Sequence, residues 1–287
     1  MAQGVLSSLS VCVVVLVWGP TQRSGTTVEG TTVEVPFELH QQHLVVAKGS
    51  VGHLSHLNLL IDTGTIPSVV SRTVARKLRL ETERSILIAF GKPVPIDSSM
   101  VDEFRIGSLS SGPVPVGIGD FSYLQGVRID AIVGLDVLVR SSFSIDYRSR
   151  VLELAPAAAT DAAIPLDVTW PFVTVRMVTA GYQLRLLVDT GSRDLVLFQA
   201  RAADVLSNAP WRGDKTVHYA SGPARLRRVD LRQVSLGEHR WDTLPGWALD
   251  RAPDGYPSAI DGVLGVMTLG CQRVRFDFDR AELGCTR

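Results

Sequence analysis

Asp62 and Asp189 are the residues of this 287-residue chain best suited to do chemistry, because each begins an Asp-Thr-Gly tripeptide. Apolar residues precede both, Leu59-Leu60-Ile61 and Leu186-Leu187-Val188, so each carboxylate follows a predicted buried strand. Burying a lone charge there costs several kcal/mol, which makes an ordinary turn aspartate a poor interpretation. If the two carboxylates meet, they share one proton, and one acts as a base while the other acts as an acid.

The two tripeptides belong to a long internal repeat. Five short segments recur in the same order at offsets of 127 to 131 residues. The matched pairs are Val35-Pro36-Phe37 with Ile164-Pro165-Leu166, Leu60-Ile61-Asp62-Thr63-Gly64-Thr65 with Leu187-Val188-Asp189-Thr190-Gly191-Ser192, Arg105-Ile106-Gly107 with Ser235-Leu236-Gly237, Ile132-Val133-Gly134 with Val263-Leu264-Gly265, and Ile145-Asp146-Tyr147 with Phe276-Asp277-Phe278. An Ala- and Pro-rich linker at 155–163 separates the copies. We therefore predict an N-terminal lobe at residues 33–157 and a C-terminal lobe at residues 158–287.

Each copy has the local pattern of an all-β fold. Short β-branched and apolar runs are bounded by Gly, Pro and Asp. A hairpin is expected over residues 43–61 with its turn at 49–52, and its counterpart over 172–188 with its turn at 179–181. The second strand of each hairpin ends directly before Asp-Thr-Gly.

A short helix is expected after each tripeptide. Val70, Val74 and Leu78 recur every four residues within residues 68–80, which predicts one apolar helical face. Residues 195–206 are expected to form the equivalent helix in the second copy.

Each half resembles a retropepsin-type aspartic protease subunit, including the bacterial ones, and the fused pair resembles the pepsin arrangement. The resemblance covers nearly the whole chain after residue 33 and rests on Asp-Thr-Gly-Thr/Ser followed by hydrophobic-hydrophobic-Gly. It implies two tandem β-barrel lobes related by a pseudo-twofold axis, with Asp62 and Asp189 as the catalytic pair at that axis. The implied function is an aspartic endopeptidase in which the pair activates a water against the peptide bond, without a covalent intermediate.

The resemblance also implies roles for the residues beside the two aspartates. A Thr would hydrogen-bond across the axis, a Gly would let backbone amides approach the carboxylates, and a hydroxyl would donate to the carboxylate and favour its charged form. These residues are Thr63, Gly64 and Thr65 in the first copy and Thr190, Gly191 and Ser192 in the second. The segments that would cross behind the loops and support them are Ile132, Val133 and Gly134, and Val263, Leu264 and Gly265.

The family folds a hairpin flap over its substrate, and each copy contains a candidate. Residues 86–93 and 217–223 both have strand residues leading to a turn. The candidate flap residues are Phe90, Gly91, Tyr219, Ser221 and Gly222. An ordinary surface hairpin without a lid role remains an equal alternative for each segment.

The N-terminus suggests export. Residues 11–18 form an apolar run of the length of a signal-peptide core. We expect residues 1–20 to be a signal peptide or an N-terminal anchor, which would place the protein in the periplasm or outside the cell. No Lys or Arg precedes the run, so a mis-set start codon is a further alternative. Residues 21–32 are expected to be a flexible tether, too short for a propeptide.

Cysteine and histidine usage gives no indication of a metal site. Cys271 and Cys285 could form one disulfide in an exported protein or remain two reduced thiols. Four histidines crowd the first hairpin, but strand residues three apart point to opposite faces, so we expect solvated histidines and neither metal nor cofactor. They are His40, His43, His53 and His56.

Composition limits the expected partners. Twenty-nine basic residues balance twenty-nine acidic ones, which leaves no overall field for nucleic acid. We expect a polypeptide substrate and a monomer, because the short linker favours pairing of the two lobes within one chain. The alternatives are a non-catalytic peptide-binding or regulatory module with the same fold, and halves that pair with another chain.

Overall fold

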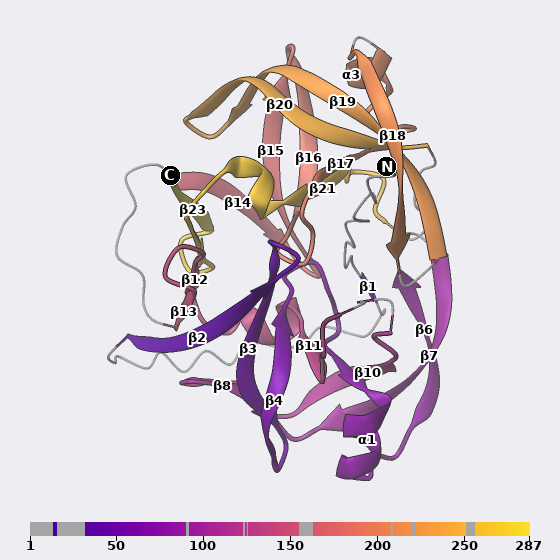
Figure 1. Ribbon diagram of the computed structural model, residues 1–287, viewed down its shortest axis with the longest axis vertical. Helices are drawn as coiled ribbons and strands as arrows, with labels where there is room; N and C mark the ends of the chain where they lie inside the picture. The colour runs from indigo at the N-terminus through magenta and orange to yellow at the C-terminus, as the bar shows by residue number, and fades with distance from the viewer. Residues whose placement is uncertain are drawn as a thin grey trace, which may run out of the picture.

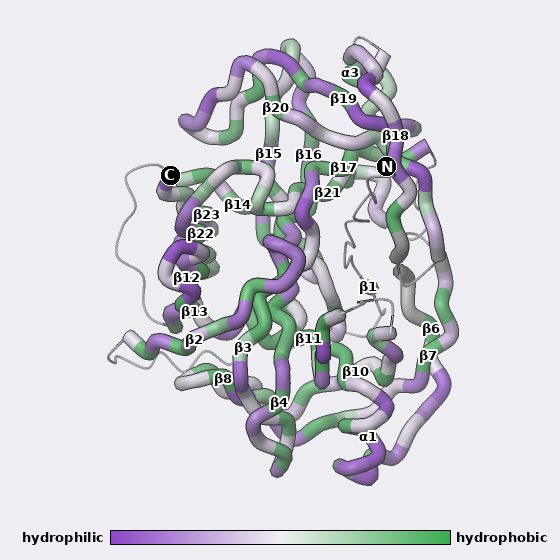
Figure 2. Tube along the Cα trace, in the orientation of Figure 1, coloured by the Kyte–Doolittle hydropathy of each residue, from purple (hydrophilic) through white to green (hydrophobic). Residues whose placement is uncertain are grey.

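The computed structural model describes residues 14–15, 32–89, 92–122, 124, 126–154, 163–207, 209–219, 222–250 and 256–287. Strands dominate these residues, and they build two barrel-like lobes joined by a shared sheet (Figure 1). Hydrophobic residues run along the inner strands of the lobes, while many turns at the outside are hydrophilic (Figure 2). The fold is therefore the all-β, two-lobed architecture predicted from the sequence.

The first lobe is a barrel in which one short strand passes between two others. Its strands are β2 (Val33–His40), β3 (Leu44–Val51), β4 (Leu54–Ile61), β5 (Val69–Ser71), β6 (Glu83–Ala89), β7 (Lys92–Val101), β8 (Phe104–Ile106), β9 (Leu109–Ser110), β10 (Val114–Gly119) and β11 (Ala131–Val133). Strand β11 lies parallel to β4 and antiparallel to β5. The ladder continues from β5 to β10, β7 and β6. This arrangement holds the end of β4, which leads into Asp62, inside the lobe.

The second lobe repeats this connectivity. Its strands are β14 (Ala163–Thr169), β15 (Phe172–Thr179), β16 (Tyr182–Asp189), β17 (Leu195–Phe198), β18 (Trp211–Tyr219), β19 (Gly222–Leu236), β20 (His239–Leu249) and β21 (Gly262–Gly265). Strand β21 lies parallel to β16 and antiparallel to β17, and the ladder continues to β20, β19 and β18. Each element has its counterpart in the first lobe, so the internal repeat of the sequence is a structural repeat.

A six-stranded sheet joins the lobes in the order β2, β13, β12, β22, β23, β14. Its remaining strands are β12 (Phe143–Asp146), β13 (Val151–Leu154), β22 (Arg273–Asp277) and β23 (Glu282–Thr286). At its centre, antiparallel β12 and β22 pair Phe143 with Phe276 and Ile145 with Val274. The repeat relates Phe143 to Val274 and Ile145 to Phe276, so the pseudo-twofold axis passes through this pair of strands.

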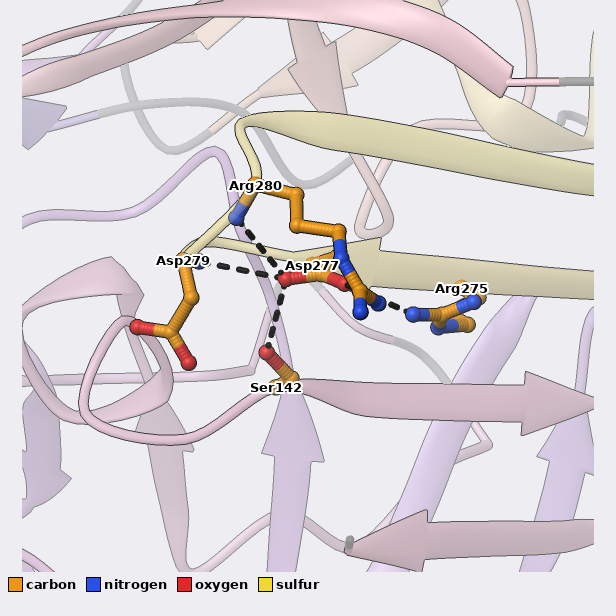
Figure 3. Close-up of polar contacts among 5 residues, drawn as sticks. All are labelled: Ser142, Arg275, Asp277, Asp279 and Arg280. Atoms are coloured by element: carbon orange, nitrogen blue, oxygen red, sulfur yellow. Dashed lines mark hydrogen bonds and ion pairs between the residues drawn. The ribbon is translucent and has the colours of Figure 1, made fainter. Parts of the chain in front are cut away.

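A polar cluster around the buried carboxylate of Asp277 secures one end of this sheet (Figure 3). The carboxylate of Asp277 accepts hydrogen bonds from the backbone of Asp279 and Arg280 at 3.2 and 3.0 Å, and lies 2.7 Å from Arg275. Ser142 of the first lobe donates to the same carboxylate at 3.4 Å. Burial raises the pKa of Asp277, but the backbone and side-chain hydrogen bonds from Arg280 and the charges of Arg275 and Arg280 outweigh it and hold the pKa below its ordinary value. The cluster is thus a contact between the lobes.

Both predicted hairpins form, and the second turns between Thr179 and Tyr182 as expected. The first turns at residues 52–53 instead of 49–52, because residues 49–51 still belong to β3. Helix α1 (Arg72–Leu78) begins after Ser71, whose hydroxyl accepts from the backbone of Val74 at 3.2 Å. Both predicted helices begin too early: residues 69–71 form β5 before α1, and residues 195–198 form β17, so that only the end of the predicted range 195–206 is helical, in α3 (Ala203–Ser207). Strand β17 is buried along its whole length, and a continuous apolar run of this kind fits a buried strand as well as a helix.

The two C-terminal cysteines form a disulfide, and the expected exposure of the histidines is only partly correct. Cys271 and Cys285 form a disulfide with their Cα atoms 5.4 Å apart, which decides between the two alternatives. His53 and His56 are exposed, but the expectation of a solvated histidine is wrong for His43, which is fully buried with Nδ1 2.9 Å from the Gln41 carbonyl oxygen. Among the residues that the structure describes, no three His, Cys, Asp or Glu side chains gather to hold a metal ion.

Little of the predicted N-terminal signal is described. Strand β1 (Val14–Val15) pairs antiparallel with β6, opposite Ala89 and Ile88. The rest of the apolar run, and the predicted tether up to residue 31, lie outside the described residues. In the described ranges, no helix is long and apolar enough to cross a membrane.

The contact between β12 and β22 yields a stability prediction. Phe276 is fully buried and stacks on Phe143 with ring centroids 4.8 Å apart. We expect Phe276→Ala to lower the free energy of unfolding by about 3–5 kcal/mol, because it leaves a cavity between the lobes. Urea denaturation measures the change. Met100→Ala is the control, since Met100 is 51% exposed; equal losses in the two variants would contradict the prediction.

Candidate active site

Asp62 and Asp189 are both fully buried at the point where the two lobes meet. Strand β4 ends at Ile61, and the backbone N–H of Asp62 donates to the carbonyl of Val133 in β11 at 3.0 Å. Asp189 is the last residue of β16 and pairs in register with Gly265 of β21. The crossing strands β11 and β21 therefore fix where each aspartate leaves its sheet.

The two loops are tied together by reciprocal hydrogen bonds of Thr63 and Thr190. The Thr63 hydroxyl donates to the carbonyl of Val188 at 2.9 Å, and the Thr190 hydroxyl donates to the carbonyl of Ile61 at 2.9 Å. Each hydroxyl also accepts from the backbone N–H of the other threonine, at 3.0 and 3.1 Å. These four buried bonds fix each loop relative to the other.

Each carboxylate packs against the glycine of the opposite loop. A Cβ atom on Gly64 would lie 2.4 Å from Cγ of Asp189, and one on Gly191 would lie 2.6 Å from Oδ2 of Asp62. Each carboxylate also accepts from its own loop, Asp62 from the N–H of Gly64 at 2.8 Å and Asp189 from that of Gly191 at 2.7 Å. The Asp62 and Asp189 side chains are themselves within hydrogen-bonding reach. Only glycine fits at these two positions.

Burial dominates the electrostatics of Asp62. It raises the pKa of this carboxyl, while hydrogen bonds from the Thr65 hydroxyl at 2.7 Å, from Asp189 and from the glycine amides act in the opposite direction. The Thr65 hydrogen bond thus favours the charged form, but the net shift of the Asp62 pKa is upward. In the second loop, the hydroxyl of Ser192 lies 3.4 Å from the carbonyl oxygen of Asp194.

The hydrophobic-hydrophobic-Gly segments lie directly behind the loops. A Cβ on Gly134 would lie 2.3 Å from the carbonyl oxygen of Thr65, and one on Gly265 would lie 2.5 Å from that of Ser192. The backbone N–H of Leu135 donates to the Thr65 carbonyl at 2.9 Å. Ile132, Val133, Val263 and Leu264 are buried in the crossing strands β11 and β21.

Sequence reasoning missed a polar pair behind the first loop. Oδ1 of Asp136 accepts from the backbone and the hydroxyl of Ser68 at 3.0 and 2.8 Å, and the Ser68 hydroxyl accepts from Gly134 at 2.9 Å. Burial raises the pKa of Asp136 to about 6. The repeat places Leu195 and Met267 at the equivalent positions, so comparing the two copies would have indicated that this pair is specific to the first loop.

Both flap candidates form hairpins. In the first, Ala89 pairs with Lys92 across the turn, and in the second Tyr219 pairs with Gly222. The two hairpins extend toward one another on the same side of the molecule in the view of Figure 1. Phe90, Gly91 and Ser221 lie outside the described residues, as does the side chain of Tyr219. The lid role of these hairpins stays a prediction.

Two barrel lobes, each ending one buried strand in Asp-Thr-Gly at a common pseudo-twofold axis, define the architecture of the two-lobed aspartic proteases. The family model of aspartyl proteases matches residues 45–137 and again residues 173–268, one match in each lobe. The chain therefore belongs to the aspartyl protease family, and the resemblance to two retropepsin-like repeats is confirmed. A comparison with curated proteins finds no match.

The reciprocal threonine bonds give a second stability prediction. Thr63→Val keeps the side-chain shape but leaves the Val188 carbonyl and the Thr190 N–H without their buried partner, which should cost about 2–5 kcal/mol of unfolding free energy. Urea denaturation of purified protein checks this value. Thr63→Ser retains the hydroxyl and should stay near the wild type; a loss as large as that of Thr63→Val would exclude hydrogen bonding as the cause.

Asp136 predicts a pH dependence of stability. The folded chain keeps a proton on Asp136 up to about pH 6, whereas an unfolded aspartate releases it near its ordinary value of 3.8. The folded state therefore binds more protons between these values, so this group makes stability fall as the pH rises from about 4 to about 6. Asp136→Asn should flatten the fall, as measured by thermal unfolding at stepped pH. An unchanged slope would contradict the raised pKa.

Proposed function

We propose that this protein is an aspartic endopeptidase in which Asp62 and Asp189 form one catalytic dyad. The observation that carries the proposal is the reciprocal packing of each carboxylate against the glycine of the opposite loop. Neither loop contains a complete site, and the pair exists only where the two lobes meet. Membership of the aspartyl protease family supports the same reaction class.

The chemistry follows from burial of two acids side by side. Two buried carboxylates that hydrogen-bond to one another cannot both ionise cheaply, so the dyad holds one proton and titrates as a pair. The ionised member takes a proton from a water, whose oxygen attacks the carbonyl carbon of the peptide bond, while the protonated member donates its proton to the carbonyl oxygen. Transfer of a proton to the amide nitrogen then breaks the C–N bond and releases an acid and an amine.

The loop contacts supply the positioning that this reaction needs. The threonine bonds hold the loops, and the Gly64 and Gly191 amides orient one oxygen of each carboxylate. Because these groups are already in place and buried, little reorganisation accompanies the movement of charge. The raised pKa of Asp62, caused mainly by burial, supports a dyad that holds its single proton more tightly than an exposed aspartate would.

The proposed function also specifies a substrate, an oligomeric state and a location for the protein. The substrate is a polypeptide in extended form lying between the lobes and the two flap hairpins, and the working unit is one chain. The interlobe sheet supports a monomer, because the strands at its centre come from the two halves of the same chain. The disulfide between Cys271 and Cys285 supports an exported protein, since such bonds persist in oxidising compartments.

The decisive test replaces each aspartate in turn. Asp62→Asn and Asp189→Asn should each reduce hydrolysis of casein, followed between pH 3 and 7, by at least about 1,000-fold, because either change removes the shared proton chemistry. Circular dichroism should show an intact fold.

Asp102→Asn, which changes an exposed carboxylate, is the matched control and should leave activity unchanged. Full activity in either dyad variant would overturn the shared-dyad mechanism. A folded wild type without peptidase activity would favour the non-catalytic peptide-binding module.

A further inference from the structure

An ion pair connects the flap of the second lobe to the second catalytic loop. Nζ of Lys215, on flap strand β18, donates to Oδ2 of Asp194 at 2.5 Å. The two side chains are only 17% and 26% exposed, so water screens this pair much less than the ion pairs at the outside of the same hairpin. The contact joins strand β18 to the loop before β17, two segments that do not pair with one another in the sheet of the second lobe.

Lys215 points into the lobe. Side chains alternate along a strand, and Val217, two residues further on, is 1% exposed, whereas Asp214 is exposed. The ammonium of Lys215 also lies 4.0 Å from the centroid of the Trp247 ring in β20. A carboxylate and an indole face therefore both attract the same cation.

Asp194 belongs to the packed loop that begins at Asp189. Its backbone carbonyl accepts from the N–H of Gly265 at 3.0 Å and from the hydroxyl of Ser192. A Cβ on Gly265 would lie 2.7 Å from the Asp194 nitrogen, so this segment has little room to shift. The side chain of Asp194 thus offers the flap an attachment point fixed to the catalytic loop.

The first lobe carries neutral residues at the corresponding positions. Val69 is the counterpart of Val196, because Val69 pairs with Ile132 as Val196 pairs with Val263. Two residues earlier, Pro67 therefore corresponds to Asp194. The flap hairpins close at the equivalent residues Ala89 and Tyr219, so Ser85, four residues before Ala89, corresponds to Lys215. Trp247 corresponds to Gly117, because these residues pair with Val196 and Val69. The contact is specific to the second lobe.

We propose that Lys215 and Asp194 form a positioning pair that holds flap strand β18 over the second catalytic loop and thereby sets the affinity for the polypeptide substrate. The part that concerns substrate rests on the proposed endopeptidase function. Neither residue is a catalytic residue, because both act through the position of the flap. Breaking the pair frees the second flap and leaves the dyad in place.

Hydrogen–deuterium exchange with mass spectrometry tests the positioning without any turnover. Lys215→Met keeps most of the side-chain stem and Asp194→Asn keeps its shape, while each removes one charge. Each variant should make peptides covering residues 214–219 and 222–227 exchange at least about tenfold faster, because the hairpin opens more often. Peptides from β12 and β22 should be unchanged.

Two further variants separate this pair from charge effects in general. Arg225→Ala breaks the ion pair with Asp214 on the same hairpin, where the side chains are 66% and 46% exposed, and should leave exchange unchanged. The charge swap Lys215→Asp with Asp194→Lys should restore slow exchange. If the flap peptides of both single variants exchanged at the wild-type rate, the positioning role of the pair would be refuted. It would also be refuted if Arg225→Ala accelerated their exchange equally.

Peptide kinetics test the consequence for substrate. In both single variants KM should rise by about tenfold while kcat stays within about twofold, because the flap contributes to binding and the dyad is intact. An unchanged KM with a freed flap, or a fall in kcat alone, would overturn the link to affinity. An inactive wild type whose single variants still show faster exchange would refute the proposed function but not the positioning.

Discussion

The two aspartates can be buried at the centre of this molecule because each carboxylate rests on the backbone of the loop that carries the other. Burial penalises the charge, and two adjacent negative charges penalise it further. Amide donors from Gly64 and Gly191 and the shared contact between the acids compensate for part of that cost. Neither lobe supplies all of these groups, so the geometry of the pair depends on the contact between the lobes.

The rest of the fold serves to hold that contact. Strands β11 and β21 cross behind the loops, where Gly134 and Gly265 allow backbone to approach backbone. Farther away, β12 and β22 join the lobes through a ladder, an aromatic stack and the Asp277 cluster. The stiffness of the site therefore comes from sheet structure on both sides of the axis.

The sequence was sufficient to predict the repeat, the hairpins that lead into Asp62 and Asp189, and the all-β class, because turn residues and apolar runs are local signals. It was insufficient for β17, since Leu195 to Phe198 are buried on both faces and show no period that separates strand from helix. The Ser68–Asp136 pair was missed because two polar residues 68 positions apart become partners only after β5 and β11 are side by side. Likewise, neither the burial of His43 nor the disulfide follows from spacing.

The reciprocal fit of glycine and carboxylate also limits how such a protein can diversify. A change at Gly64 damages the surroundings of Asp189, and a change at Gly191 damages those of Asp62, so neither half can drift alone at these positions. Away from the axis, a single fused chain allows its halves to diverge, as Ser68 and Asp136 have from Leu195 and Met267. Exchanging one half for that of a distant relative therefore requires a match both at these backbone atoms and along β12 and β22, with the outer surfaces free to carry new preferences.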